Sequence, residues 1–385
     1  MHIFISTGEV SGDLQGAILI KALKEEAAIA NLELEINALG GDRMKQAGAT
    51  ILGDTTSIGS VGLLEALPFV IPTLKLQNKT KKYLLKNIPD VLVLIDYAAP
   101  NIAIGRYVKK NLPQVPIIYY IAPQDWVVPV LGNAAKLTRF VDKLLAIFPE
   151  EANYYQKKGI DTTWVGHPLL DRIKKTPDRL VSRQLLKISS EQTLITLLPA
   201  SRRQEINQML PIIAQAASLI QQQIPNIHFL IPVSLDLYND AIVAIVKQYQ
   251  LSATILKDRT LEAISAADLA ITKSGTVNLE IALLNIPQVV LYRVHPVTAW
   301  LARNLLKIKV PLMSPPNLIV NREIVPELQQ ESATPTNIAN TALNLLSNSL
   351  KRQQMIADYQ KMRSLLGEIG VGKKAAKEIL AFKKN

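Results

Sequence analysis

The sequence predicts an α/β protein with two doubly wound parallel sheets, and three observations support this fold class. Short apolar runs alternate with helical patterns along most of the 385 residues. The alternation comes in two series, which a polar stretch flanked by prolines separates. Hydrophobic residues make up 48% of the chain and charged residues 19%, as is typical of folded proteins. A chain of this length accommodates two domains more readily than one.

The first series of apolar runs predicts one parallel sheet. Helical patterns such as 13–27 and 101–111 lie between the runs. Near-continuous apolar strands are typical of parallel sheets that helices cover on both faces. The expected strands are residues 2–7, 33–40, 91–95, 115–122, 143–148 and 162–166.

The second series predicts another sheet of the same kind, after a domain join within the polar stretch 168–192. Its expected strands are residues 193–199, 228–233, 253–257, 269–272 and 288–292. The last part, 335–384, has a polar helical pattern and no expected strand. We therefore expect an N-terminal domain at 1–170, a second domain at 171–345 and C-terminal helices at 346–385 that pack back on the first domain. Such sheets bind ligands at the carboxyl ends of their strands, so two of them predict a cleft between the domains.

The composition excludes several kinds of chemistry. The chain has no cysteine and only four histidines, and none of these forms a metal-binding pair. No D-x-D motif is present, so the acidic metal clamp of many sugar-nucleotide enzymes is missing, and we expect neither a metal nor a cofactor. The apolar start ends within a few residues at Gly8, so we expect no signal peptide. No apolar run is long enough to span a bilayer.

A formal net charge of +11 indicates an acidic partner. Nucleic acid, an anionic membrane and a phosphorylated substrate all fit this charge. Aromatic residues make up only 5% of the chain, which provides few stacking platforms for a single strand. We therefore expect a membrane surface or a phosphate-bearing ligand and no nucleic acid.

The stretch "STGEVSGDLQGA" follows the first expected strand and has a glycine at every fourth position from Gly8. We expect a helix to begin near Gly12 and Asp13. Glycine permits a positive φ and lets a ligand or another backbone approach closely. Asp13 could cap this helix. The alternative is a tight turn with an N-cap and no ligand.

Two later turns are candidate phosphate sites. Ser201 and Arg202 follow the strand at 193–199, where a hydroxyl, a guanidinium and helix-start amides suit a phosphate; the alternative is a solvated basic turn. Ser274, Gly275 and Thr276 open a helix after the strand at 269–272 and could cradle a diphosphate. Glu280, one turn further on, could accept hydrogen bonds from a ribose. The alternative makes Ser274 an ordinary N-cap and Glu280 an ordinary first-turn acid.

Asp96 ends a fully apolar strand at its carboxyl end, where a carboxylate could take a proton from a substrate hydroxyl. The alternative is an N-cap for the next helix, which the intervening Pro100 disfavours. A polar, proline-stiffened segment at 315–330 is a further candidate functional loop.

Eight segments in order resemble the lipid-A-disaccharide synthase family. Together they are specific, although each one alone is weak. They are "GEVSGDLQGA", "VGLLEAL", "IDYAAPN", "APQDW", "VGHPLLD", "LLPASRRQEI", "SGTVNLEIALLNIPQVVLYR" and "SPPNLIVNREIVPELQQ". The sequence departs from the family pattern at Val128, in place of a second Trp, at Ala200, in place of Gly, and in the "YAAPN" segment.

The resemblance implies a GT-B fold and an inverting, metal-independent glycosyl transfer. The donor is UDP-2,3-diacylglucosamine, the acceptor is 2,3-diacylglucosamine 1-phosphate, and the products are the β-1,6-linked lipid A disaccharide and UDP. It implies catalytic roles for Asp96, as general base, and for Arg202, Asn317 and Gln330. Ser201, Ser274, Gly275, Thr276 and Glu280 would bind the donor. Gly8, Glu9, Ser11, Gly12 and Asp13 would form the loop on the acceptor side.

Because both substrates carry acyl chains, the enzyme must reach a membrane. Segments 67–87 and 297–310 interleave apolar and basic residues, which suits an anionic bilayer surface. The alternative for each is a core-facing helix with a solvated basic face. We expect a peripheral protein on the cytoplasmic face of the inner membrane, and the family suggests a homodimer. The alternative functions are a GT-B enzyme for another UDP-sugar and an inactive membrane-associated scaffold.

Overall fold

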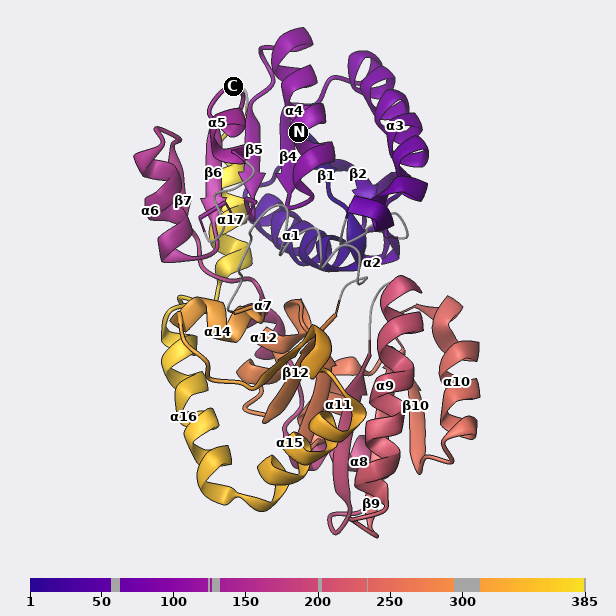
Figure 1. The fold of residues 1–385 in the computed structure, drawn as a ribbon. Coiled ribbons are helices and arrows are strands. Elements are labelled where there is room, and N and C mark those ends of the chain that lie inside the picture. The colour runs from indigo at the N-terminus through magenta and orange to yellow at the C-terminus, as the bar shows by residue number, and fades with distance from the viewer. Residues whose placement is uncertain are drawn as a thin grey trace. The chain divides into compact units, whose positions relative to one another are not determined.

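The fold is described from a computed structural model of the chain (Figure 1). The structure describes residues 1–56, 63–123, 125–126, 132–199, 203–233, 235–293 and 312–383. Internal contacts divide the chain into two compact units. The first unit contains Met1–Val61, Glu65–Arg172 and Leu365–Asn385, and the second contains Gly62–Leu64 and Ile173–Ser364.

The first unit is built on a seven-stranded sheet in the order β3-β2-β1-β4-β5-β6-β7, with every neighbouring pair parallel. The central strand β4 is buried at every residue, because helices cover both faces of the sheet. The strands are β1 (His2–Ser6), β2 (Glu35–Gly40), β3 (Thr50–Asp54), β4 (Val91–Ile95), β5 (Ile117–Tyr120), β6 (Lys143–Ala146) and β7 (Thr162–Trp164).

The helices of the first unit pack on the two faces of this sheet. Side chains of α3, α4, α5 and α6 share one core with Phe4, Leu92 and Tyr119. On the other face α1 contacts the strands and α17 (Figure 1). The helices are α1 (Glu9–Ile29), α2 (Asp42–Gln46), α3 (Leu63–Lys86), α4 (Ala98–Asn111), α5 (Asn133–Leu137), α6 (Pro149–Lys157), α7 (Leu169–Ile173) and α17 (Val371–Leu380).

The C-terminal helix α17 is fastened to the first unit by charge and by burial. Asp171 accepts hydrogen bonds from the backbone N–H groups of Gly370 (2.5 Å) and Gly372 (2.8 Å), so its carboxylate caps the helix N-terminus. The apolar face of α17 is fully buried, as Ala375 and Ile379 show. The chain thus returns to its first sheet after completing the second unit.

The second unit has a six-stranded parallel sheet in the order β10-β9-β8-β11-β12-β13. Its strands are β8 (Thr193–Leu198), β9 (Ile227–Val233), β10 (Ala253–Lys257), β11 (Leu269–Lys273), β12 (Gln288–Tyr292) and β13 (Glu327–Gln329). Its helical elements are α8 (Arg179–Leu185), α9 (Arg203–Gln221), η2 (Asp236–Tyr238), α10 (Asn239–Gln248), α11 (Thr260–Ala266), α12 (Thr276–Leu283), α14 (Pro315–Val320), η4 (Gln330–Ser332), α15 (Pro335–Ser347) and α16 (Ser349–Ser364).

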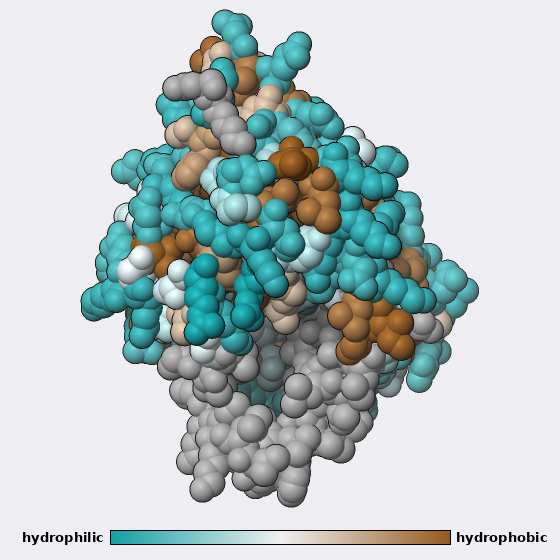
Figure 2. Space-filling view, turned by 90° about the horizontal axis from the view of Figure 1, so that it is seen from above, coloured by the Kyte–Doolittle hydropathy of each residue, from teal (hydrophilic) through white to brown (hydrophobic). Residues whose placement is uncertain are grey.

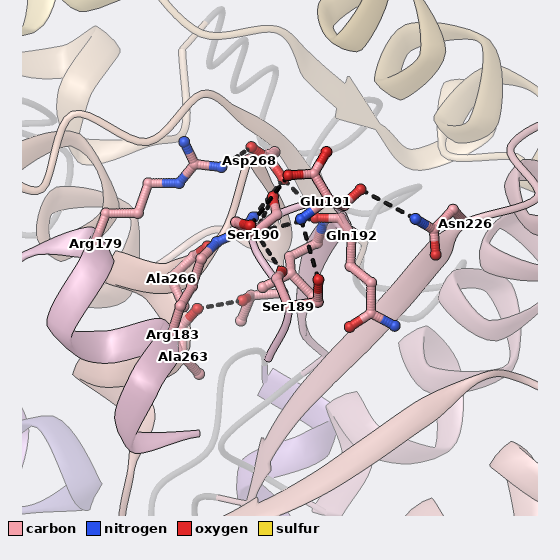
Figure 3. A network of polar contacts seen from close by, with 12 residues as sticks. Arg179, Arg183, Ser189, Ser190, Glu191, Gln192, Asn226, Ala263, Ala266 and Asp268 are labelled. Carbon is pink, nitrogen blue, oxygen red and sulfur yellow. Dashed lines mark hydrogen bonds and ion pairs between the residues drawn. The ribbon is translucent and has the colours of Figure 1, made fainter. Parts of the chain in front are cut away.

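A buried arginine attaches the linker helix α8 to the second sheet (Figure 3). Arg183 donates from Nε to the carbonyl of Ala266 (3.0 Å) and from Nη2 to the Asp268 carboxylate (2.9 Å). Nη1 donates to the carbonyls of Ser189 (2.9 Å), Ser190 (3.0 Å) and Gln192 (3.1 Å). Since the guanidinium uses its donors in this way, the polar linker is held as an ordered part of the second unit.

Every strand that the sequence predicts is present, with ends that shift by up to two residues. Two strands were missed, β3 and β13. Both lie at sheet edges, where partial exposure removes the need for a continuous apolar run. The expectation that 335–384 contains helices and no strand is confirmed for the part of it that the structure describes.

The glycines of the first strand-to-helix turn make room for protein side chains. A Cβ at Gly8 would lie 2.4 Å from the ring of Tyr97, and a Cβ at Gly12 would lie 2.0 Å from Thr7 Oγ1. Helix α1 begins at Glu9, so the expected start near Gly12 is wrong by about one turn. Gly8 and Gly12 therefore allow residues that follow β1 and β4 to pack closely against this turn.

We expect Gly12→Ala to lower the free energy of unfolding by about 1–3 kcal/mol, because its new Cβ would overlap the hydroxyl of the fully buried Thr7. Thr7→Ala removes that hydroxyl, so the double variant should lose less than the sum of the single changes. Chemical denaturation of the four proteins measures this coupling. Strictly additive losses would contradict the proposed overlap.

Candidate active site

Asp96 stands at the carboxyl end of the central strand β4. Its side chain is exposed, whereas all five residues of the strand before it are buried. Asp96 and Tyr97 both have left-handed backbone conformations, with φ of 46° and 48°. Such conformations are uncommon outside glycine and cluster at functional sites. The N-cap residue of α4 is Tyr97 and Pro100 lies in its first turn, so Asp96 does not serve as the cap.

Buried polar groups hold the backbone of Asp96 on both sides. Its carbonyl accepts hydrogen bonds from Tyr119 Oη (2.7 Å) and Asn101 Nδ2 (2.8 Å). Its N–H donates to the carbonyl of Ile121 (3.1 Å). Burial raises the pKa of the Tyr119 hydroxyl well above 10, and the charge of Asp96 adds to the rise, so this hydroxyl remains a donor. The conformation of Asp96 is thus fixed from neighbouring elements of the sheet.

Asn101 joins the ends of β1 and β4 at this edge and was missed by the sequence analysis. It is fully buried, and its amide also donates to the carbonyls of Ser6 (3.2 Å) and Ile95 (3.0 Å). Its Oδ1 accepts from Ser6 Oγ (2.7 Å). A polar side chain in the first turn of a helix that follows a buried strand is the signal that could have identified it.

Asp13 has a structural role that differs from the expected one. It lies inside α1, almost fully buried, and does not cap that helix. Its carboxylate accepts from the backbone N–H groups of Gly41 (2.8 Å), Arg43 (3.1 Å) and Met44 (3.1 Å), so it caps α2. The local sequence suggested a cap for the nearest helix, whereas tertiary contact assigned the carboxylate to another one.

The other residues expected on the acceptor side lie at the same strand end. Gly8 is the N-cap position of α1 and has no capping side chain. Glu9 follows it with φ of 63°, and its N–H donates to the carbonyl of Thr55 (3.1 Å). Ser11 is half-buried and Gly12 is buried. Their assignment to an acceptor site stays a prediction.

Two further buried carboxylates, Asp125 and Glu151, follow β5 and β6 along the chain. Glu151 is 1% exposed and accepts from the N–H groups of Ala122 (2.9 Å), Ile147 (2.8 Å) and Phe148 (3.3 Å). Burial raises its pKa to about 7, and these three hydrogen bonds oppose the rise.

Asp125 lies in the "APQDW" segment and was also missed as an individual residue. Its carboxylate accepts from Asn133 Nδ2 (2.9 Å) and from the N–H of Ala134 (2.9 Å), which caps α5. Acids in the first turn of a helix, or next to a short loop before one, were the available sequence signal for both carboxylates. Gln124 and Val128 of the same region lie outside the described residues.

In the second unit, the turn from β11 to α12 contains three predicted donor-site residues. Gly275 is the N-cap of α12, its N–H donates to Asn278 Oδ1 (2.8 Å), and a Cβ there would be in ordinary contact with Lys273, 3.4 Å from Nζ. Ser274 is not the cap: its Oγ donates to the carbonyl of Met313 (2.8 Å). Thr276 begins the helix and Glu280 is buried one turn later. The spacing therefore brings the predicted residues to one helix start.

Asn317 is buried and uses its whole amide within the chain. Nδ2 donates to the carbonyl of Val325 (2.9 Å) and to Glu327 Oε1 (2.6 Å). Oδ1 accepts from the N–H groups of Ile324 (2.7 Å) and Val325 (2.9 Å). An amide can make four such hydrogen bonds, so the geometry gives Asn317 a role in shaping this loop. Its expected catalytic role stays a prediction.

Glu327, a polar residue of the candidate functional loop 315–330, joins the start of α14 to β13. It accepts from the N–H groups of Met313 (2.8 Å) and Ser314 (2.9 Å). Gln330 follows β13 directly, is half-buried and has φ of 48°. This strained backbone after a strand end matches that of Asp96. The likeness is one of backbone conformation, and the expected catalytic role of Gln330 stays a prediction.

Some predicted site residues cannot be placed. Ser201 and Arg202 lie outside the described residues, as do Ala200 and the whole of segment 297–310. Within the described parts of the chain, no group of three or more acidic, histidine or cysteine residues could hold a metal ion.

Buried His167 predicts a specific pH dependence of stability. Burial lowers its pKa from 6.5 to about 3, so between these values the unfolded chain binds a proton that the folded chain does not. Stability is then lost as the pH falls below about 6.5, by up to about 1.4 kcal/mol per pH unit. His167→Asn should flatten this loss, as measured by urea unfolding at pH 7, 6 and 5. Parallel pH profiles for the two proteins would contradict it.

Comparison with known proteins tests the resemblance. A family model described as Lipid-A-disaccharide synthetase matches residues 3–381. A Lipid-A-disaccharide synthase of Gloeothece citriformis (strain PCC 7424) is 56% identical over 383 residues, which cover 99% of this chain and 100% of that protein. A protein of the same name from Synechocystis sp. (strain ATCC 27184 / PCC 6803 / Kazusa) is 53% identical over 385 residues, with coverage of 99% and 98%.

Solved structures agree on the fold. The UDP-GlcNAc 2-epimerase from Neisseria meningitidis bound to UDP-GlcNAc superposes with a TM-score of 0.68 at 13% identity, covering 99% of this chain and 100% of that one. MurG of Acinetobacter baumannii gives a TM-score of 0.54 at 14% identity, with 99% of each chain covered. These likenesses confirm the two-domain GT-B fold. The family match along nearly the whole sequence, with relatives above 50% identity, shows that this chain belongs to the lipid-A-disaccharide synthase family of glycosyltransferases.

Proposed function

We propose that the enzyme transfers 2,3-diacylglucosamine from its UDP form to the 6-hydroxyl of 2,3-diacylglucosamine 1-phosphate, with inversion at the anomeric carbon. The products are the β-1,6-linked lipid A disaccharide and UDP. One observation carries this proposal beyond the family name: Asp96 is an exposed carboxylate on a strained, doubly anchored backbone at the carboxyl end of a central strand. Such a group suits a general base.

The proposed reaction divides between the residues of the two units. Asp96 takes the proton of the acceptor's 6-hydroxyl, and the oxygen attacks the donor carbon from the face opposite UDP. The bond from that carbon to the diphosphate breaks, and UDP leaves with the electron pair. Arg202 and the helix start at Ser274 to Thr276 stabilise the charge that develops on UDP. No metal is needed for these steps.

The donor part of this proposal draws support from the helix start of α12. Lys273 lies beside Gly275 at this N-terminus, and both a basic side chain and a helix N-terminus favour phosphate groups. We propose that Ser201 also contacts the diphosphate and that Glu280 binds the ribose. Two solved structures with this fold are described as complexes with uridine nucleotides. The Neisseria epimerase is bound to UDP-GlcNAc, and S. aureus MnaA is bound to UDP.

We propose that helix α3 brings the enzyme to the cytoplasmic face of the inner membrane. Its residues Val70, Ile71 and Leu74 are 44%, 65% and 53% exposed. Exposed lysines follow on the same helix, at Lys75, Lys79, Lys82 and Lys86. Figure 2 shows hydrophobic patches among hydrophilic residues on the face that it draws. Apolar side chains beside lysines suit an anionic lipid surface.

No helix among the described residues has the length and hydropathy to cross a bilayer. The proposed contact therefore concerns a helix that lies on the membrane. We also propose that the enzyme forms a homodimer, on the strength of the family resemblance alone. Size-exclusion chromatography with light scattering tests that state.

A transfer assay tests the reaction itself. The enzyme is given UDP-2,3-diacylglucosamine and the acylated sugar 1-phosphate in the presence of a chelator, and disaccharide formation is followed. UDP-N-acetylglucosamine serves as the unacylated control donor. Product from the acylated donor alone, undiminished by chelator, is the expected result. UDP binding without product would indicate that the substrate is another UDP-sugar. The absence of both UDP binding and product would favour an inactive scaffold.

Asp96→Asn should lower kcat by about 10²- to 10⁴-fold, the usual contribution of a general base. UDP affinity and the unfolding midpoint should not change, because the side chain is exposed and its backbone contacts remain. The transfer assay and calorimetric UDP titration measure these quantities. Normal turnover in this variant would remove the base assignment.

Replacing Ile71 and Leu74 with serine should weaken binding to anionic vesicles by at least about tenfold, since each apolar side chain withdrawn from water contributes about 1.5–3 kcal/mol. The matched control replaces Leu180 and Leu185 of α8, which are 70% and 49% exposed, with serine. Vesicle flotation compares the two double variants. An equal effect of both would contradict a specific role of α3.

A further inference from the structure

One peptide group at the edge of the first sheet lies between two acidic residues. The carbonyl of Ile121 accepts the N–H of Asp96 (3.1 Å), and the N–H of Ala122 donates to Glu151 Oε1 (2.9 Å). This carbonyl and this N–H belong to the same peptide group. A continuous hydrogen-bonded path therefore runs from the buried carboxylate of Glu151 to the backbone of Asp96.

We propose that Glu151 is a positioning residue for Asp96: by fixing the Ile121–Ala122 peptide group, its carboxylate sets the backbone conformation that presents the Asp96 side chain. The proposal rests on the proposed function, in which Asp96 is the general base. It assigns Glu151 no contact with substrate.

Glu151 is itself held rigidly enough for this task. Its other oxygen, Oε2, accepts from the N–H groups of Ile147 (2.8 Å) and Phe148 (3.3 Å). These groups lie between the end of β6 and the start of α6, so the carboxylate ties three segments together. At 1% exposure it has no room to turn toward water. A buried carboxylate with both oxygens used fixes its partners more firmly than a solvated one.

The backbone on this path is strained. Ile121 has φ of 60°, which is an outlier for a β-branched residue. Asp96 and Tyr97, across the hydrogen bond, are also left-handed. Conformations of this kind persist only where the surrounding structure imposes them. Asn101 and Tyr119 hold the carbonyl side of Asp96. Its N–H donates to the carbonyl of Ile121 (3.1 Å), which Glu151 fixes, and at longer distance to that of Tyr120 (3.4 Å).

Electrostatics also connects the two carboxylates. Burial raises the pKa of Glu151 to about 7, and the charge of Asp96 contributes to this rise. Burial is the main cause that raises the pKa values of Tyr120 and Tyr155; the charge of Asp171 adds to the rise for Tyr120 and that of Asp125 for Tyr155, and the charge of Glu151 comes next in both. The charge of Asp96 thus acts on the carboxyl group of Glu151, which remains buried and hydrogen-bonded within the protein.

Glu151→Gln tests the proposal because it keeps the shape and removes one acceptor oxygen. Either the N–H of Ala122 or those of Ile147 and Phe148 must then face the new amide. We expect kcat to fall by about 10- to 100-fold, as for a base displaced by a fraction of an ångström to 1 Å, while the KM for the donor and UDP affinity stay within twofold. Glu151→Asp, which keeps the charge but shortens the reach, is the second variant and should show the same split.

The matched control is Asp142→Asn. Asp142 accepts from the N–H of Ile117 (2.9 Å) at the amino end of β5, the same strand whose other end leads to Ala122. This control should lower the unfolding midpoint but leave kcat unchanged. If kcat falls equally in Asp142→Asn and in Glu151→Gln, the effect of Glu151→Gln is a general loss of stability, and the proposal is overturned.

A double-mutant cycle shows whether Glu151 acts through Asp96. If it does, adding Glu151→Gln to Asp96→Asn causes no further loss of kcat. A further loss equal to that in the wild-type background would overturn the proposal, as would wild-type kcat in Glu151→Gln.

Amide hydrogen exchange provides a readout that does not depend on activity. Glu151→Gln should speed exchange at Ala122 and Asp96, and Asp142→Asn should not. Unchanged protection at both amides in Glu151→Gln would overturn the proposal. If the wild-type enzyme makes no disaccharide, the proposed function fails, whereas the exchange measurement still decides whether Glu151 holds this backbone.

Discussion

Where parallel strands are buried on both faces, backbone groups in the turns at their carboxyl ends need hydrogen-bond partners within the protein. The rest of the structure depends on which side chains provide these partners. A backbone N–H or carbonyl that is buried without a partner destabilises the fold, so polar side chains must reach it. In this chain buried carboxylates and amides take that role. Asp13, Glu151 and Asn101 do so in the first unit, and Asn317 and Glu327 do so in the second.

The polar residues at these turns fall into two groups: buried side chains that hydrogen-bond within the chain, and exposed or half-buried side chains on left-handed backbone. Asp13 and Asn317 are nearly or fully buried, and every hydrogen bond described for their side chains stays within the chain. Asp96 and Gln330 follow strand ends in left-handed conformations, and their side chains are exposed or half-buried. A rigid buried layer therefore supports a small number of strained residues at the edge. For the proposed catalytic roles, such positioning means that the side chain needs no reorganisation when a substrate binds.

The polar linker and the C-terminal helix are also held by single polar side chains, at positions away from the candidate site. Arg183 holds the polar linker as an ordered part of the second unit, because its guanidinium donates hydrogen bonds to four carbonyls and one carboxylate. Asp171 fastens the start of α17 to the first unit. In both places one side chain with several hydrogen-bonding atoms replaces an apolar core that the local sequence does not provide.

The sequence by itself determined the two sheets, the positions of most of their strands and the segments that carry the family resemblance, because buried parallel strands and Gly-rich or proline-rich turns have local signatures. It also indicated that Asp96 ends a buried strand. It did not identify β3 and β13, whose edge positions require no continuous apolar run. Only the tertiary structure decided that Asp13 caps α2 instead of its own helix, that Asn101 joins the ends of β1 and β4, and that Glu151 and Asp96 hydrogen-bond to the same peptide group. These relations connect residues far apart in the chain, and hydrogen-bond partners of that kind are set by which strand ends the fold brings together.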